Sequence, residues 1–93
     1  MIVGILTIWL EIPGSNSLKD KRQALKSLLS ILRNKFNISV AEVGENDTWR
    51  RAVIGMACVS NDQAQVSAVF NKVTRHVESD PRVGILETRM EML

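Results

Sequence analysis

The side chains that could do chemistry in this chain are mainly cations, and they gather in one segment. Residues 18–36 hold six Lys and Arg side chains against one Asp, a net charge of +5 within a chain whose total charge is +2. At about 100° per residue of helix, four of these cations fall within about 60° of one another on one flank. They are Lys19, Arg22, Lys26 and Arg33, which we call the basic ridge.

A row of cations of this kind suits a phosphate backbone. Each neutralised phosphate releases counterions, so the affinity depends steeply on salt concentration. The same pattern also fits a solvated helix flank whose long side chains cover apolar surface. The basic ridge therefore indicates either a nucleic-acid contact or an ordinary solvent-facing flank.

A second candidate for nucleic-acid binding is the run Trp49, Arg50 and Arg51. An exposed indole can stack on an unpaired base while nearby guanidinium groups hold phosphates, as in single-stranded RNA recognition. Alternatively, Trp49 fixes a hairpin against the sheet edge and the two arginines pair with acids. Six acids accompany six bases at this end of the predicted fold. The bases are Lys19, Lys21, Arg22, Arg50, Arg51 and Arg82.

The residues offer little support for catalysis. His76 is the only histidine, and no nucleophile stands at a matching place in the sequence. Cys58 alternates with apolar residues, which is typical of a core position rather than of an activated thiolate. The acids Glu42, Glu45 and Asp47 lack the ordered oxygen spacing of a calcium loop. We therefore predict a protein that is not an enzyme and has no metal and no cofactor.

Length and composition favour a single compact domain over residues 1–93. Of these 93 residues, 45% are hydrophobic and 24% are charged. The apolar start from Met1 to Leu10 is too short to cross a bilayer and has no basic leader. One cysteine fits a reducing compartment. We expect a cytoplasmic protein without a membrane partner.

Period-two hydropathy predicts the strands. From Ile2 to Ile12 the even positions carry no polar side chain, whereas the odd positions include Thr7 and Glu11. This alternation is typical of a strand whose even face lies in the core. Further strands are predicted over residues 38–43, 51–59 and 83–92, with a bulge or register change expected in the first of these.

Two helices are predicted from apolar stripes with a period of 3.6 residues. The first covers residues 18–36 and begins after Ser17, which starts an approximate capping box. The second begins at a capping box formed by Ser60 and Gln63 and ends before Pro81.

The resulting order is βαββαβ, which for a small domain with right-handed crossovers predicts an α+β ferredoxin-like sandwich. In this fold, two helices cover one face of a four-stranded antiparallel sheet, and the first and third strands are central. The first turn, the hairpin and the loop before the last strand then lie at one end, which places Trp49 near Lys19 and Arg22.

The sheet face opposite the helices is predicted to be apolar. Its central side chains are Val3, Ile5, Trp9, Val53 and Val59, which we call the open face. A large apolar patch on a soluble protein favours a partner, so we expect a homodimer through this face. In the alternative interpretation, the C-terminal tail or the hairpin folds over it.

Several segments resemble the YlxP-like family of small bacterial proteins of unknown function. They are residues 17–22, 37–43, 59–62, 77–78 and 80–83, together with Asp47, Trp49, Arg51 and Ala52. The resemblance implies a ferredoxin-like fold. It also implies a role around RNA or the ribosome, because genes of the family commonly lie beside those for translation initiation and ribosome maturation factors. Family members often carry a histidine after the acid of the hairpin, where this chain has Gly44-Glu45-Asn46.

Together these observations predict a non-catalytic binding module that associates with RNA or the ribosome through the basic ridge. Its partner would be ribosomal RNA or a ribosomal particle. The competing prediction is a protein-interaction or assembly module that uses the open face and does not bind nucleic acid.

Overall fold

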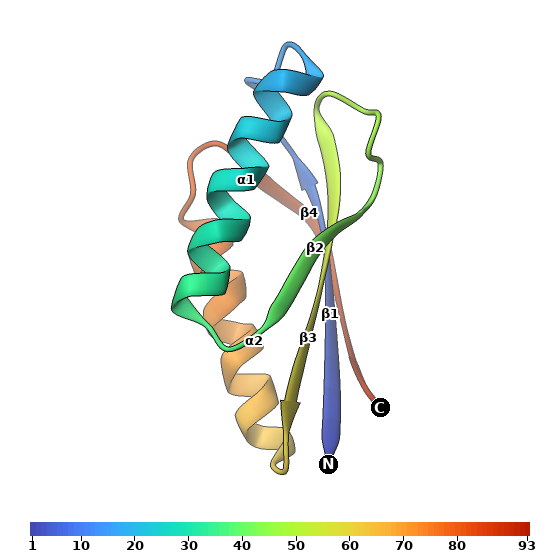
Figure 1. Cartoon of the computed structure of the whole chain (residues 1–93), viewed down its shortest axis with the longest axis vertical. Helices are drawn as coiled ribbons and strands as arrows, with labels where there is room; N and C mark the ends of the chain where they lie inside the picture. The colour runs from blue at the N-terminus through green and yellow to red at the C-terminus, as the bar shows by residue number, and fades with distance from the viewer.

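Two helices lie on one side of an antiparallel sheet in the computed structural model, which describes residues 1–93 (Figure 1). The six elements follow the predicted βαββαβ order. They are β1 (Ile2–Glu11), α1 (Leu18–Lys35), β2 (Ser39–Gly44), β3 (Arg51–Ser60), α2 (Gln63–Glu78) and β4 (Gly84–Met92). No helix has the length and apolar character needed to cross a bilayer.

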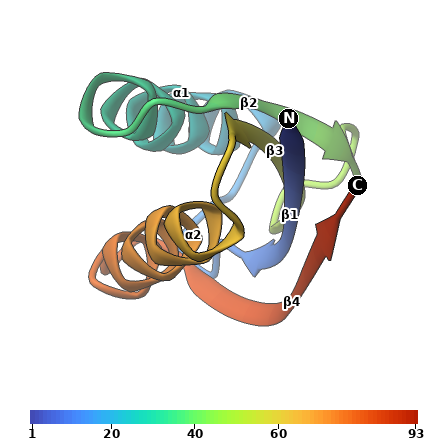
Figure 2. The same cartoon turned by 90° about the horizontal axis from the view of Figure 1, so that it is seen from below.

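The four strands are arranged in the order β2-β3-β1-β4, and all neighbouring pairs are antiparallel. Strands β1 and β3 are therefore central, and Figure 2 shows both helices on the same side of the sheet. This arrangement confirms the predicted ferredoxin-like sandwich.

The even face of β1 forms the centre of the core, as its alternation predicts. Leu6, Ile8 and Leu10 are buried beneath the helices, in a cluster of 17 buried residues. Gly4 continues this face where α2 comes closest to the strand. A Cβ atom at Gly4 would overlap Val66 and lie 2.9 Å from Phe70 Cε2, so only glycine permits this approach.

The two helix starts differ in how well they match the sequence patterns. At α1, the Ser17 side chain accepts a hydrogen bond from Asp20 N, and Asp20 Oδ2 accepts one from Asn16 N, an arrangement close to a capping box. At α2, the prediction of a capping box at Ser60 is wrong. Ser60 still belongs to β3, and Asp62 caps the helix by accepting from Ala64 N.

The predicted irregularity in β2 is confirmed by a register shift between Glu42 and Gly44. After it, the chain leaves the sheet through a connection in which Glu45 adopts a φ of 55°. A positive φ is uncommon for a residue other than glycine, so the surrounding contacts must hold this turn in place.

A lysine from α1 supplies those contacts. Lys21 is 0% exposed, and its Nζ donates hydrogen bonds of 2.6, 2.7 and 2.9 Å to the carbonyl oxygens of Glu45, Thr48 and Arg51. The Glu42 Oε2 atom lies 2.9 Å from the same Nζ. Because the three ammonium protons are already matched by three carbonyls, Glu42 contributes charge rather than a hydrogen bond. Lys21, one of the six bases expected at this end of the fold, is therefore a buried structural residue paired with an acid.

Replacing Lys21 with Met should lower the free energy of unfolding by about 3 kcal/mol or more. The substitution leaves three carbonyls without a donor and Glu42 without a counter-charge. Urea denaturation measures the effect, and Lys19→Met, at an exposed cation two residues away, should stay within about 0.5 kcal/mol of the wild type. A Lys21→Met protein as stable as the Lys19→Met control would contradict the role of Lys21.

Candidate nucleic-acid interface

The basic ridge lies exposed along one flank of α1. Lys19 and Arg33 are about 21 Å apart along the helix axis at a rise of about 1.5 Å per residue. The chain contains two ion pairs, Lys21 with Glu42 and Arg82 with Asp80, and neither involves the ridge. The ridge charges therefore remain available to an external anion.

One member of the basic ridge also has a structural contact. Arg33 Nη2 donates a hydrogen bond of 2.8 Å to the carbonyl oxygen of Val40 on β2. This bond places the C-terminal end of the ridge beside the sheet edge formed by β2. Lys19, Arg22 and Lys26 make no hydrogen bond or ion pair through their side chains.

The hairpin meets the β1–α1 turn at one end of the molecule, as predicted (Figure 1). Arg50 makes this junction: its Nε donates to Ser15 O at 2.9 Å and its Nη2 donates to Asn16 Oδ1 at 3.2 Å. Arg50 therefore holds two loops together and does not pair with an acid. Neither does Arg51, which is exposed opposite Glu11 in the β1–β3 register.

Trp49 is 54% exposed, and it directly follows Thr48, whose carbonyl is bound by Lys21 of α1. The indole thus lies on the connection that the first turns of α1 hold in place. An indole with more than half of its surface in water can act as a stacking platform. The structure brings Trp49 to the end of the fold where the basic ridge begins.

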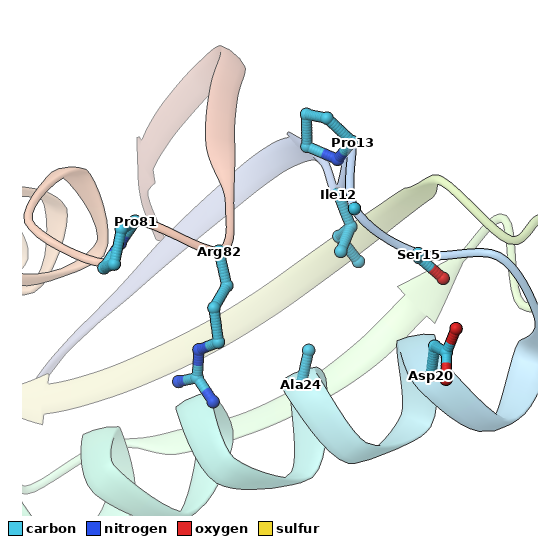
Figure 3. A pocket seen from close by; sticks show the side chains of 8 residues that line it. Ile12, Pro13, Ser15, Asp20, Ala24, Pro81 and Arg82 are labelled. Carbon is cyan, nitrogen blue, oxygen red and sulfur yellow. The ribbon is translucent and has the colours of Figure 1, made fainter.

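A hollow of about 290 Å³ opens between the β1–α1 turn, α1 and the α2–β4 loop (Figure 3). Its charged groups are already engaged. Arg82 donates to both carboxylate oxygens of Asp80, at 3.0 and 2.7 Å, and these bonds lower the pKa of Asp80 and raise that of Arg82. The Asp20 carboxylate accepts from Asn16 N within the α1 cap. This hollow therefore offers no unengaged charge with which to recognise a ligand.

The residues considered for catalysis lie apart. Cys58 is buried in the core, which confirms its prediction as a core residue. His76 lies on α2 with its ring edge-on to Phe36, at 6.4 Å between centroids. No group of three or more His, Cys, Asp or Glu side chains is close enough to hold a metal ion.

A second group of cations was not predicted. It lines a hollow of about 360 Å³ between the C-terminal ends of the two helices, which we call the cationic hollow. The lining residues are Lys35, Phe36, Lys72, Arg75, His76 and Ser79. Two of these residues come from α1 or its cap and four from the α2 region, so only the tertiary fold brings them together.

The open face is uncovered, and it is less uniform than predicted. Val3, Ile5 and Trp9 are half-buried, and Val59 is 59% exposed. Val53 points to the same face but is only 8% exposed, because the β2 bulge packs against it at Gly44.

The alternative in which the C-terminal tail covers the open face is wrong. Leu93 N donates to Val3 O at 2.8 Å, so the tail continues beside β1 at the level of the sheet. The hairpin is held toward α1 by Lys21 and Arg50. A shallow hollow of about 400 Å³ therefore stays open above the small residues Ala41, Gly55 and Ala57.

Comparison with known proteins agrees with the resemblance found in the sequence. A family model described as "Protein of unknown function (DUF503)" matches residues 3–90. The "Uncharacterized protein YlxP" of Bacillus subtilis (strain 168) is 39% identical over 77 residues, which are 83% of this chain and 84% of that protein.

Among solved structures, the de novo designed protein Foldit4 superposes with a TM-score of 0.54 and 10% identity, over 100% of this chain and 97% of that one. At this identity the likeness reflects the fold alone. Because the family model spans nearly the whole chain and a relative at 39% identity covers most of it, we conclude that this protein belongs to the DUF503 family.

Proposed function

We propose that this protein is a non-catalytic module of the cytoplasm that binds RNA through the basic ridge. The observation that carries the proposal is the state of the ridge cations: Lys19, Arg22 and Lys26 are exposed and have no acidic partner. Cations in this state lose little on binding a phosphate, because no existing ion pair has to be broken. The expected partner is structured RNA, such as that of a ribosomal particle, as the family resemblance implies.

Trp49 adds a second kind of contact at the end of the ridge. The Lys21 and Arg50 bonds fix the connection that carries the indole, so little conformational freedom is lost when a base stacks on it. An RNA strand along the ridge would then place an unpaired base on Trp49. Arg51, exposed at the start of the strand that follows, is the residue that we propose holds the adjacent phosphate.

The second candidate function is protein assembly through the open face, and the observation that favours it is that nothing in the chain covers this face. The exposed Val59 and the apolar walls of the shallow hollow offer a surface that water solvates poorly. A second copy of the chain is the partner we propose for it.

Charge reversal of Lys19, Arg22 and Lys26 to Glu should abolish RNA association while the fold stays intact. Arg33 is left in place because its bond to Val40 supports the sheet edge. The measurement is binding of labelled ribosomal RNA across a salt series: the wild-type affinity should fall steeply as the salt concentration rises, and the variant should show no binding at any salt concentration.

A pair of single variants controls for net charge. Lys26→Glu should weaken binding, whereas Arg89→Glu, at an exposed cation on β4, should leave it unchanged. Equal losses in both would show that only the overall charge matters and that the ridge is not the contact.

Trp49→Ala should weaken the binding of single-stranded RNA by about 1–3 kcal/mol. Fluorescence gives an independent reading: in a Trp9→Phe background, Trp49 is the only indole, and stacking should quench it. Unchanged affinity together with a lowered melting temperature would instead assign Trp49 a structural role.

Val59→Glu and Ile5→Glu should convert a weak homodimer into a folded monomer, since each places a charge in the apolar interface. Val53 is unsuitable for this test because it is buried. Sedimentation equilibrium measures the oligomeric state, with Ile31→Glu on α1 as the matched apolar-to-acid control. A wild-type protein that is purely monomeric at high micromolar concentration would rule out this assembly.

A further inference from the structure

We propose that the cationic hollow binds a small phosphate-bearing ligand of the nucleotide class. This site goes beyond the RNA contact. The basic ridge lies on the flank of α1 that reaches β2 through Arg33, whereas the cationic hollow lies on the flank that faces α2. The two surfaces therefore have separate residues and can be tested separately.

The first observation is the charge of the lining. Lys35, Lys72 and Arg75 are cationic, His76 becomes so when protonated, and no acidic side chain lines the hollow. None of the four takes part in an ion pair. Groups of like charge around one concave space repel each other, so an anion between them would relieve that repulsion.

The preference for cations in the last turn of a helix explains some of the charged residues in the hollow but not all of them. Cations are favoured in the last turn of a helix, where Lys35, Arg75 and His76 lie. Lys72 stands one turn earlier on α2, outside the reach of that effect, and still faces the same space. Asp80 lies close enough to the hollow for the charge of His76 to contribute to lowering its pKa. Its carboxylate is already bound by two hydrogen bonds from Arg82, so it does not neutralise the hollow.

The second observation is an aromatic surface beside the cations. Phe36 is half-buried, and its ring is met edge-on by His76 and approached by Lys35, whose Nζ lies 5.9 Å from the ring centroid. The Phe36 N–H donates to Leu32 O, which fixes the residue at the end of α1. A ligand with a phosphate and a flat ring would use both parts of the hollow at once.

The size of the hollow agrees with such a ligand. Its volume of about 360 Å³ is at the small end of the range for small-molecule sites. Ser79 adds a hydroxyl whose proton is donated to His76 O at 2.6 Å, which leaves the oxygen as an acceptor for a sugar hydroxyl. Phosphate, sugar and base each have a matching group, and this combination points to a mononucleotide.

The test is a titration of the uniformly ¹⁵N-labelled protein, followed by amide chemical shifts, with adenosine monophosphate, inorganic phosphate and adenosine as separate probes. We expect adenosine monophosphate to shift the amides of residues 35–36 and 72–79. Inorganic phosphate should shift the same amides but bind more weakly, and adenosine alone should bind more weakly still. No localised shift at millimolar nucleotide would overturn the proposal. Equal affinities for phosphate and nucleotide would overturn the assignment of a nucleotide.

Two variants connect the shifts to these side chains. Arg75→Glu should weaken nucleotide binding by about tenfold or more, because it replaces a charge-assisted contact with a repulsive one. Lys26→Glu on the basic ridge is the matched control and should leave nucleotide binding unchanged. If both variants weakened nucleotide binding equally, the nucleotide would be attracted by the overall charge of the protein and not held at this site, and the proposal would be overturned. Since the ridge variants test RNA and the Arg75 variant tests the nucleotide, either proposal can fail while the other stands.

Discussion

The position of the β2–β3 connection depends on the ammonium group of Lys21, which is buried away from water. Removing a charge from solvent costs several kcal/mol, and the cost is offset only when all its donors are matched and a counter-charge is near. Three carbonyl oxygens and Glu42 meet both conditions around Lys21. Two of those carbonyls, of Glu45 and Thr48, lie in the connection outside the strands, and the third, of Arg51, lies at the start of β3. The lysine therefore supplies the connection with hydrogen bonds that the sheet does not. In this way a helix, rather than a strand, determines where the connection lies.

At the same end of the molecule, some cations form hydrogen bonds within the protein and others are exposed to solvent without a partner. Lys21 and Arg50 bind carbonyl or amide oxygens and join segments that are distant in sequence, whereas Arg82 binds the carboxylate of Asp80 within its own loop. Lys19 and Arg22 on the outer flank of α1, and Arg51 at the start of β3, carry no such bond. Composition alone does not separate these groups, because a buried lysine such as Lys21 and an exposed lysine such as Lys19 differ only in what the fold places around them.

Features that depend on one strand or helix could be predicted from the sequence, whereas features that depend on contacts between distant elements could not. The period-two pattern of β1 and the apolar stripes of both helices report burial directly, so strands, helices and their order could be predicted. The α2 cap could not be fixed, because Ser60 and Asp62 are both good caps two residues apart and the extension of β3 decides between them. Burial of Lys21 had no local signal, since its neighbours are charged and its partners lie 24 to 30 residues away. The cationic hollow had no local signal either, because Phe36 and Lys72 line one space only after the two helices are brought together by the fold.

The helices and the open face lie on opposite sides of one sheet (Figure 2). Two copies joined through their open faces would form four layers, with sheets inside and helices outside. Each basic ridge would then face away from the other, and the pair would be bivalent for polyanions. Because the second contact of a tethered pair is intramolecular, two weak ridges would act as a cross-link between neighbouring RNA segments, with an avidity set by the distance between those segments.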